Sequence, residues 1–104
     1  MSTINKLAAT IAARATASPD SSYTAKLLHD GIEKCAKKFG EEAFELALAA
    51  ASKDKAHTAQ EAADVIYHLL VLLQASGVSL AEVETVLATR EAQSGLDEKA
   101  NRRG

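Results

Sequence analysis

Five acidic residues stand in two stretches of this sequence that are otherwise rich in apolar residues: Glu41, Glu42, Glu45, Glu61 and Asp64. Glu42 and Glu45 are three residues apart, as are Glu61 and Asp64, and this spacing puts each pair on one face of a helix. Like charges so placed repel each other, and burying them without a partner is costly. Each helix therefore needs either solvent or a cation beside its acidic face.

A solvated outer face is the ordinary explanation for clustered charges, and it is the alternative here. The helix that carries Asp64 argues against it, because apolar residues occupy most of its circumference. These residues are Ala62, Ala63, Val65, Ile66, Leu69 and Leu70. No lysine stands between Lys55 and Lys99 to neutralise Asp64. We therefore predict a divalent cation between two antiparallel helices, held by both acidic pairs.

The four predicted metal ligands are all hard oxygen donors: Glu42, Glu45, Glu61 and Asp64. Such a set favours magnesium, or manganese, over zinc, for which histidine and cysteine are expected. A ferritin-like di-iron site is not expected, since its motif needs a histidine three residues after Glu61, where this chain has Asp64. Magnesium usually keeps several waters and binds substrate phosphates. The predicted site therefore implies a ligand that carries phosphate.

Lysines precede the first acidic pair. Lys34 and Lys38 lie on the same helical stripe as Glu41 and Glu45. One interpretation is local ion pairing of Lys37 and Lys38 with the acids, although lysine N-terminal to glutamate is the weaker order. The other is that Lys34 and Lys38 contact phosphate oxygens beside the metal. The sequence leaves both interpretations open.

Helices must position these residues. Apolar periodicity and turn formers predict helical segments at about residues 4–17, 23–39, 41–51, 54–75 and 79–91. Gly31 and Gly40 are weak points, and a kink or restart is expected near Gly31. The long segment begins at Asp54 or, by the spacing of a capping box, at Thr58. Ser79 opens the last helix with the same spacing.

The composition favours an all-α fold, with one proline, five glycines and no tryptophan among 104 residues. We expect one domain, residues 1–104, with a polar and partly flexible tail at about 94–104. A chain this short buries a limited core by itself. We therefore expect a four-helix bundle completed by a homodimer.

Charge and cysteine content restrict the partners and the compartment. A net charge of -2 provides no general attraction to nucleic acid or to an anionic membrane. No apolar run approaches the roughly 20 residues that span a bilayer. The lone Cys35 has no disulfide partner within the chain and is expected to be a buried apolar side chain in a reducing cytoplasm.

The pattern Glu41-Glu42-x-x-Glu45, fifteen residues and then Glu61-x-x-Asp64 resembles the signature of the all-α nucleoside triphosphate pyrophosphohydrolases of the MazG type. Residues 22–28, 37–43, 63–73 and 94–100 narrow the resemblance to the phosphoribosyl-ATP pyrophosphohydrolase family, over nearly the whole chain. Cys35 and Phe39 depart from that pattern, where smaller or branched aliphatic residues are common. Both lie outside the acidic motif and bear only on local packing.

This resemblance implies hydrolysis of phosphoribosyl-ATP to phosphoribosyl-AMP and pyrophosphate, the second step of histidine biosynthesis, in a homodimer. Glu41 would hold a second metal ion or take the proton of the attacking water. Tyr23 and His68 join the lysines as substrate-binding residues. Tyr23 either stacks on adenine or covers the core. His57 and His68 stand at helical spacing from the second acidic pair, which permits a supporting hydrogen bond, although most histidines are structural or solvated.

Two other functions remain open. A house-cleaning pyrophosphohydrolase for ordinary or damaged nucleoside triphosphates would share the acids but not the stretches at 22–28 and 94–100. A non-catalytic helical dimerisation module would leave the acids in solvent and associate through leucines. These leucines are Leu69, Leu70, Leu72 and Leu73.

Overall fold

The structure is a computed structural model that describes residues 2–93. This part of the chain forms five α-helices and no strand, which confirms the predicted all-α class. The helices are α1 (Thr3–Arg14), α2 (Tyr23–Asp30), α3 (Ile32–Ala51), α4 (Lys55–Ser76) and α5 (Leu80–Glu91). The expected tail, residues 94–104, lies outside the described residues.

Side-chain caps determine where α4 and α5 begin. The carboxylate of Asp54 accepts a hydrogen bond from the backbone N–H of His57, at 3.1 Å, so α4 starts one turn before the capping box considered at Thr58. Thr58 instead lies inside the helix and donates its hydroxyl to the Asp54 carbonyl. The predicted capping box of Ser79 and Glu82 is present, with both reciprocal hydrogen bonds.

Gly31 separates α2 from α3. Its φ of 105° lies in the left-handed region, which side chains with a Cβ rarely adopt, so the expected restart near this glycine is confirmed. Gly40, the other expected weak point, is accommodated inside α3 without a break. Gly77 ends α4 with a φ of 74°. The break at Gly31 turns α2 back across the start of α3, which brings Tyr23 to the acidic helix pair.

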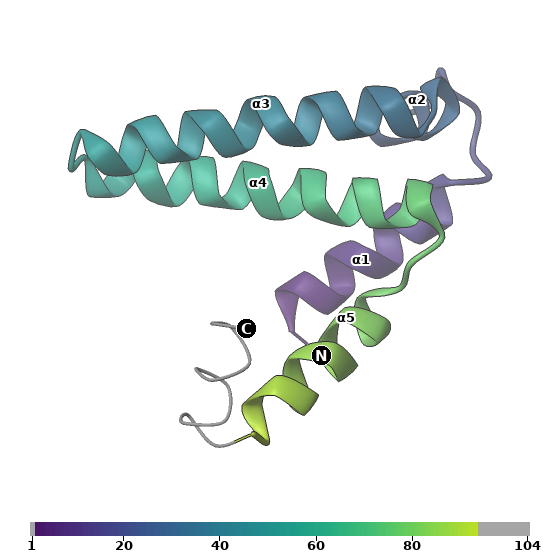
Figure 1. The fold of residues 1–104 in the computed structure, drawn as a ribbon. Coiled ribbons are helices and arrows are strands. Elements are labelled where there is room, and N and C mark those ends of the chain that lie inside the picture. The colour runs from purple at the N-terminus through teal and green to yellow at the C-terminus, as the bar shows by residue number, and fades with distance from the viewer. Residues whose placement is uncertain (1, 94–104) are drawn as a thin grey trace.

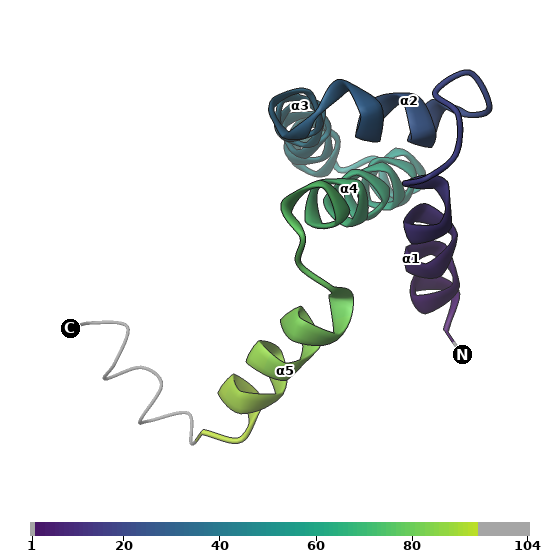
Figure 2. The same ribbon diagram turned by 90° about the vertical axis from the view of Figure 1, so that its right-hand side faces the viewer.

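The two long helices, α3 and α4, run antiparallel along their whole length and form the largest contact between elements (Figure 1). The helices α1 and α2 pack at one end of this pair, where α3 begins and α4 ends. Figure 2 shows α5 extending away from α4, and α5 buries none of its residues. The predicted four-helix bundle, completed by a second copy, stays a prediction.

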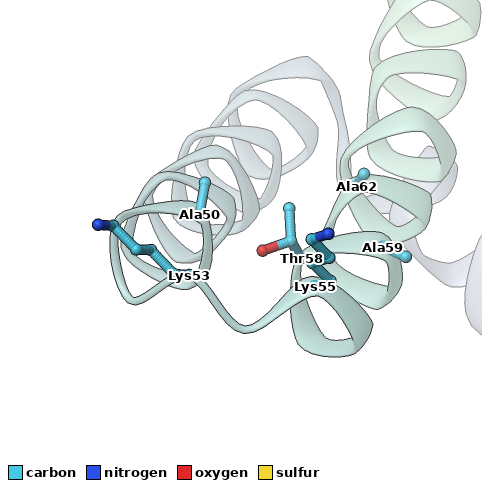
Figure 3. A pocket seen from close by; sticks show the side chains of 6 residues that line it. All are labelled: Ala50, Lys53, Lys55, Thr58, Ala59 and Ala62. Atoms are coloured by element: carbon cyan, nitrogen blue, oxygen red, sulfur yellow. The ribbon is translucent and has the colours of Figure 1, made fainter.

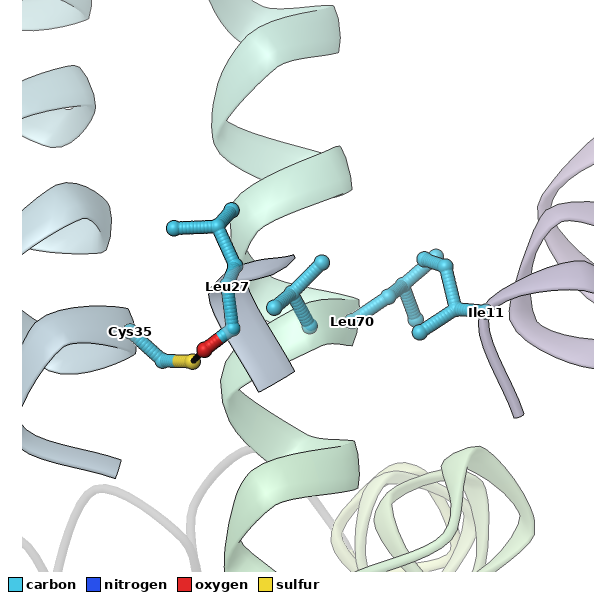
Figure 4. Close-up of a cluster of buried hydrophobic side chains, with 5 residues drawn as sticks. Ile11, Leu27, Cys35 and Leu70 are labelled. Atoms are coloured by element: carbon cyan, nitrogen blue, oxygen red, sulfur yellow. Dashed lines mark hydrogen bonds between the residues drawn. The ribbon is translucent and has the colours of Figure 1, made fainter. Parts of the chain in front are cut away.

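The buried core lies where α1 and α2 meet the long helices. It is formed by Ile11, Leu27, Cys35, Leu70 and Val71 (Figure 4). Cys35 is 1% exposed, and its thiol donates a hydrogen bond to the Leu27 carbonyl at 3.3 Å. Burial raises the pKa of this thiol, and the charge of Asp30 adds to the rise. Cys35 is therefore the buried side chain that the sequence predicted.

Within residues 2–93, no single helix is long and apolar enough to cross a membrane. The helices α4 and α5 meet the criteria of length and composition only when they are taken together as a pair bent by 108°.

Candidate active site

Three of the four predicted metal ligands meet between α3 and α4. One carboxylate oxygen each from Glu42, Glu61 and Asp64 lies within 4.8 Å of the others. Glu42 stands in the middle of α3, and the other two stand one turn apart in the first half of α4. The packing of α3 against α4 places the acidic faces of the two helices opposite each other. The structure thus gathers negative charge from both halves of the motif.

Two of these carboxylates, those of Glu42 and Glu61, are partly buried, whereas Asp64 is exposed. Partial burial raises the pKa of Glu42, and the charges of Asp64 and then Glu61 raise it further, while Lys38 acts in the opposite direction. Glu61 is half-buried, and its Oε2 atom is buried without a hydrogen-bond partner among residues 2–93. Its other oxygen lies 3.2 Å from Nε2 of His57. A buried oxygen atom of this kind requires a donor or a cation.

The remaining two acids of the motif lie beside this cluster. Glu45 is exposed on α3 and does not belong to the three carboxylates within 4.8 Å, although its charge contributes to the raised pKa of Glu42. Glu41 is also exposed, and its carboxylate pairs with Lys38 at 3.3 Å. The position of Lys38 is therefore compatible with both interpretations, local ion pairing with the acids and contact with phosphate oxygens. The roles of Glu41 and Glu45 stay predictions.

Lys34 stands about two turns before Glu42 on α3, and Tyr23 is the first residue of α2. They line a cavity of about 260 Å³ between α2 and α3, together with Lys38. The remaining residues of its wall are Lys26, Leu27 and Asp30. The structure therefore separates Lys34 from the acidic cluster and places Lys38 at the boundary between the cluster and this cavity.

His68 lies one turn beyond Asp64 on α4 and is 6% exposed. Its ring meets those of Tyr67 and Tyr23 edge-on, with centroids 4.9 Å and 6.3 Å away. Its Nδ1 atom is buried without a hydrogen-bond partner within residues 2–93. Burial lowers the pKa of His68, and the charge of Lys38 lowers it further. His68 is thus a neutral, buried side chain beside the acids.

Two contacts near this site carried no signal in the sequence. The hydroxyl groups of Thr24 and Tyr67 form a short hydrogen bond between α2 and α4, so Tyr67 joins the core with a satisfied hydroxyl. Lys26 enters the cavity wall only because Gly31 reverses the chain. Neither feature follows from spacing along one helix, because the hydrogen bond joins α2 to α4 and the cavity lies between α2 and α3.

A larger cavity of about 540 Å³ opens where α3 turns into α4 (Figure 3). Alanine side chains and Thr58 line it, and Lys53 and Lys55 stand at its edge. No acidic residue between positions 2 and 93 contributes to this wall. The cavity therefore carries none of the predicted chemistry, although it is the more spacious of the two.

Comparisons with known proteins match nearly the whole described helical region. The family model described as phosphoribosyl-ATP pyrophosphohydrolase matches residues 4–91, which include every site residue discussed above. Similar curated proteins carry the name phosphoribosyl-ATP pyrophosphatase. The one from Cereibacter sphaeroides strain ATCC 17029 is 59% identical over 102 residues, 98% of this chain and 99% of its own. The protein from Dinoroseobacter shibae is 59% identical over 98% of this chain and 100% of its own. The Rhodopseudomonas palustris protein, named phosphoribosyl-ATP pyrophosphatase 1, is 55% identical over 97% of this chain and 94% of its own.

Proposed function

Because this chain belongs to the phosphoribosyl-ATP pyrophosphohydrolase family, we propose that it hydrolyses phosphoribosyl-ATP to phosphoribosyl-AMP and pyrophosphate. This is the second step of histidine biosynthesis, and we place it in the cytoplasm. The observation that carries the proposal is the cluster of Glu42, Glu61 and Asp64, whose carboxylate oxygens lie within 4.8 Å of one another. The negative charges of a triphosphate are neutralised by a divalent cation, and the three clustered carboxylates are suited to bind such a cation.

We propose that the cluster holds magnesium, with manganese as a substitute, and that Glu45 completes the ligand set. The donors fit, since all are carboxylate oxygens and Oε2 of Glu61 has no other partner within the described residues. When bound, such an ion neutralises developing charge on the phosphates and lowers the pKa of a water molecule. His57 supports the arrangement by holding the second oxygen of Glu61 at 3.2 Å.

In the proposed reaction, a water oxygen attacks the α-phosphorus and the bond from that phosphorus to the bridging oxygen breaks. Pyrophosphate then leaves with the bridging oxygen, and the water proton passes to a base. Glu41 is the proposed base, because its exposed carboxylate stands next to the ligand set. Lys38, 3.3 Å from Glu41, is positioned to bind a phosphate oxygen as the charge develops.

We also propose that the working enzyme is a homodimer. Phe44 and Leu48 stand one turn apart on α3 and are 63% and 52% exposed, which is unusual for large apolar side chains. The pair lies on the helix that supplies Glu42. A second copy packed on this face would bury the pair and complete a four-helix bundle around the acids.

The test measures pyrophosphate release from phosphoribosyl-ATP, ATP, dATP and dUTP in parallel, each with magnesium and with chelator. We expect magnesium-dependent release from phosphoribosyl-ATP, with little from the ordinary nucleotides. Release mainly from ATP, dATP or dUTP would instead identify a house-cleaning enzyme. No release from any nucleotide would favour the dimerisation module.

A further inference from the structure

The cavity between α2 and α3 is rich in positive charge. Among the described residues, three lysines line it, against a single acid, Asp30. Lys26 pairs with Asp30 at 3.5 Å, and Lys38 pairs with Glu41 at 3.3 Å. Lys34 has no carboxylate within salt-bridge distance among residues 2–93, and therefore brings an uncompensated charge to the cavity wall. Such a cavity suits an anion.

Its position relative to the acidic cluster follows from the geometry of α3. Lys34, Lys38 and Glu42 are spaced by four residues and share one stripe of the helix. The helical rise places Lys38 about 6 Å and Lys34 about 12 Å from Glu42 along the axis. The far end of the cavity is thus separated from the metal-binding acids by two helical turns.

Tyr23 links the two regions from the other side. Its ring lines the cavity, and it also meets the ring of His68, which stands one turn from Asp64 on α4. The cavity and the acidic cluster are therefore connected through Lys38 on α3 and through the contact between Tyr23 and His68. A ligand with anionic groups at both ends, separated by a nucleoside, would match this arrangement.

Phosphoribosyl-ATP has this form, because it carries a triphosphate on the adenosine and a further 5′-phosphate on the ribose joined to N1. ATP carries only the triphosphate. We infer that the cavity lined by Lys26 and Lys34 binds the 5′-phosphate of the N1-linked ribose, while the acids and Lys38 take the triphosphate end. This inference rests on the proposed function and extends it, since it makes Lys26 and Lys34 the residues that distinguish phosphoribosyl-ATP from ATP.

The first experiment compares kcat/KM for phosphoribosyl-ATP and for ATP in the wild type, Lys34→Gln and Lys26→Gln. Each substitution should lower kcat/KM for phosphoribosyl-ATP about tenfold, mainly through KM, and lower the preference over ATP by a similar factor. The matched control is Lys37→Gln, since Lys37 is an exposed lysine on the same helix that does not line the cavity. Lys37→Gln should have the same kcat/KM for phosphoribosyl-ATP and for ATP as the wild type.

The opposite change provides a gain of function. Asp30 is the acid in the cavity wall, and Asp30→Asn removes its repulsion toward a phosphate. This variant should lower KM for phosphoribosyl-ATP by about two- to threefold. Raising the ionic strength should reduce the effect of Asp30→Asn on KM. It should also reduce the preference of the wild type for phosphoribosyl-ATP over ATP, because both effects depend on partly exposed charges.

A binding measurement separates this inference from the reaction. Calorimetry with phosphoribosyl-AMP and AMP, without metal, should show tighter binding of phosphoribosyl-AMP to the wild type and loss of that difference in Lys34→Gln. If Lys34→Gln lowered kcat/KM equally for phosphoribosyl-ATP and for ATP, Lys34 would be assigned to the triphosphate and the inference would be overturned. Unchanged kcat/KM values in both Lys34→Gln and Lys26→Gln would also overturn it. Failure of the wild type to hydrolyse phosphoribosyl-ATP would instead contradict the proposed function.

Discussion

His57 and Glu61 stand one turn apart on α4, with Nε2 of the histidine 3.2 Å from Oε1 of the glutamate. The other oxygen of Glu61 is buried and has no hydrogen-bond partner among residues 2–93. One oxygen of the Glu61 carboxylate is therefore held in place by His57, while the buried oxygen lacks a hydrogen-bond partner within the described residues. This asymmetry is what a ligand for a cation requires, because an oriented donor loses little freedom when the ion binds.

Glu61→Gln should lower kcat/KM by at least about a hundredfold, because the substitution removes one of the proposed metal ligands. The metal-free variant should be no less stable than the wild type, since one of three mutually repelling charges is lost. Magnesium should raise the Tm of the wild type by about 5 °C or more and leave that of the variant unchanged. Glu84→Gln, on the exposed face of α5, is the control. An equal shift in Glu61→Gln and the wild type would contradict the metal site.

Glu45→Gln tests whether the fourth acid joins the ligand set. We expect turnover to be abolished while helicity, measured by circular dichroism, stays unchanged, because Glu45 is exposed on α3 and supports no core contact. The three clustered acids lie within 4.8 Å of one another without it, so a bound ion would have to draw this side chain inward. Retained activity would remove Glu45 from the metal site.

His68 predicts a pH dependence of stability. Its pKa is lowered from the ordinary 6.5 by burial and then by Lys38, while Asp64 and Glu41 act in the opposite direction. The unfolded chain therefore binds this proton more tightly than the folded one. The contribution of His68 to stability is present above pH 6.5 and is lost as the pH falls toward the lowered pKa.

An NMR titration of the ring should give a midpoint for His68 below 6.5. Between pH 7.5 and 5.5, the Tm of the wild type should fall by a few degrees more than that of His68→Gln. A midpoint at or above 6.5 would show that the ring is solvated or paired with an acid in solution.

Phe44→Glu tests the proposed dimer face. Sedimentation equilibrium should give twice the chain mass of 10.9 kDa for the wild type and the mass of one chain for the variant, because a buried charge opposes association. Val86→Glu, at an exposed apolar residue of α5, should leave the mass unchanged. A wild type that sediments as a single chain would contradict the homodimer.

The sequence alone determined the helical class and most helix ends. Local rules govern both, because a cap such as Ser79 with Glu82, or a stop such as Gly77, acts within one turn of the chain. The acidic motif was also visible, since like charges three residues apart on an apolar helix stand out against the pattern. The sequence did not determine whether α4 begins at Asp54 or at Thr58.

Only the tertiary structure decided how these faces meet. It brought Glu42 within reach of Glu61 and Asp64 while leaving Glu45 outside, because the register of two antiparallel helices depends on packing along their whole length. It also separated Lys34 from the acidic cluster, although Lys34 and Glu45 were placed on one helical stripe. The break at Gly31 folds α2 over the start of α3, so the cavity that holds Lys34 arises from contacts between helices, which periodicity along a single helix does not encode.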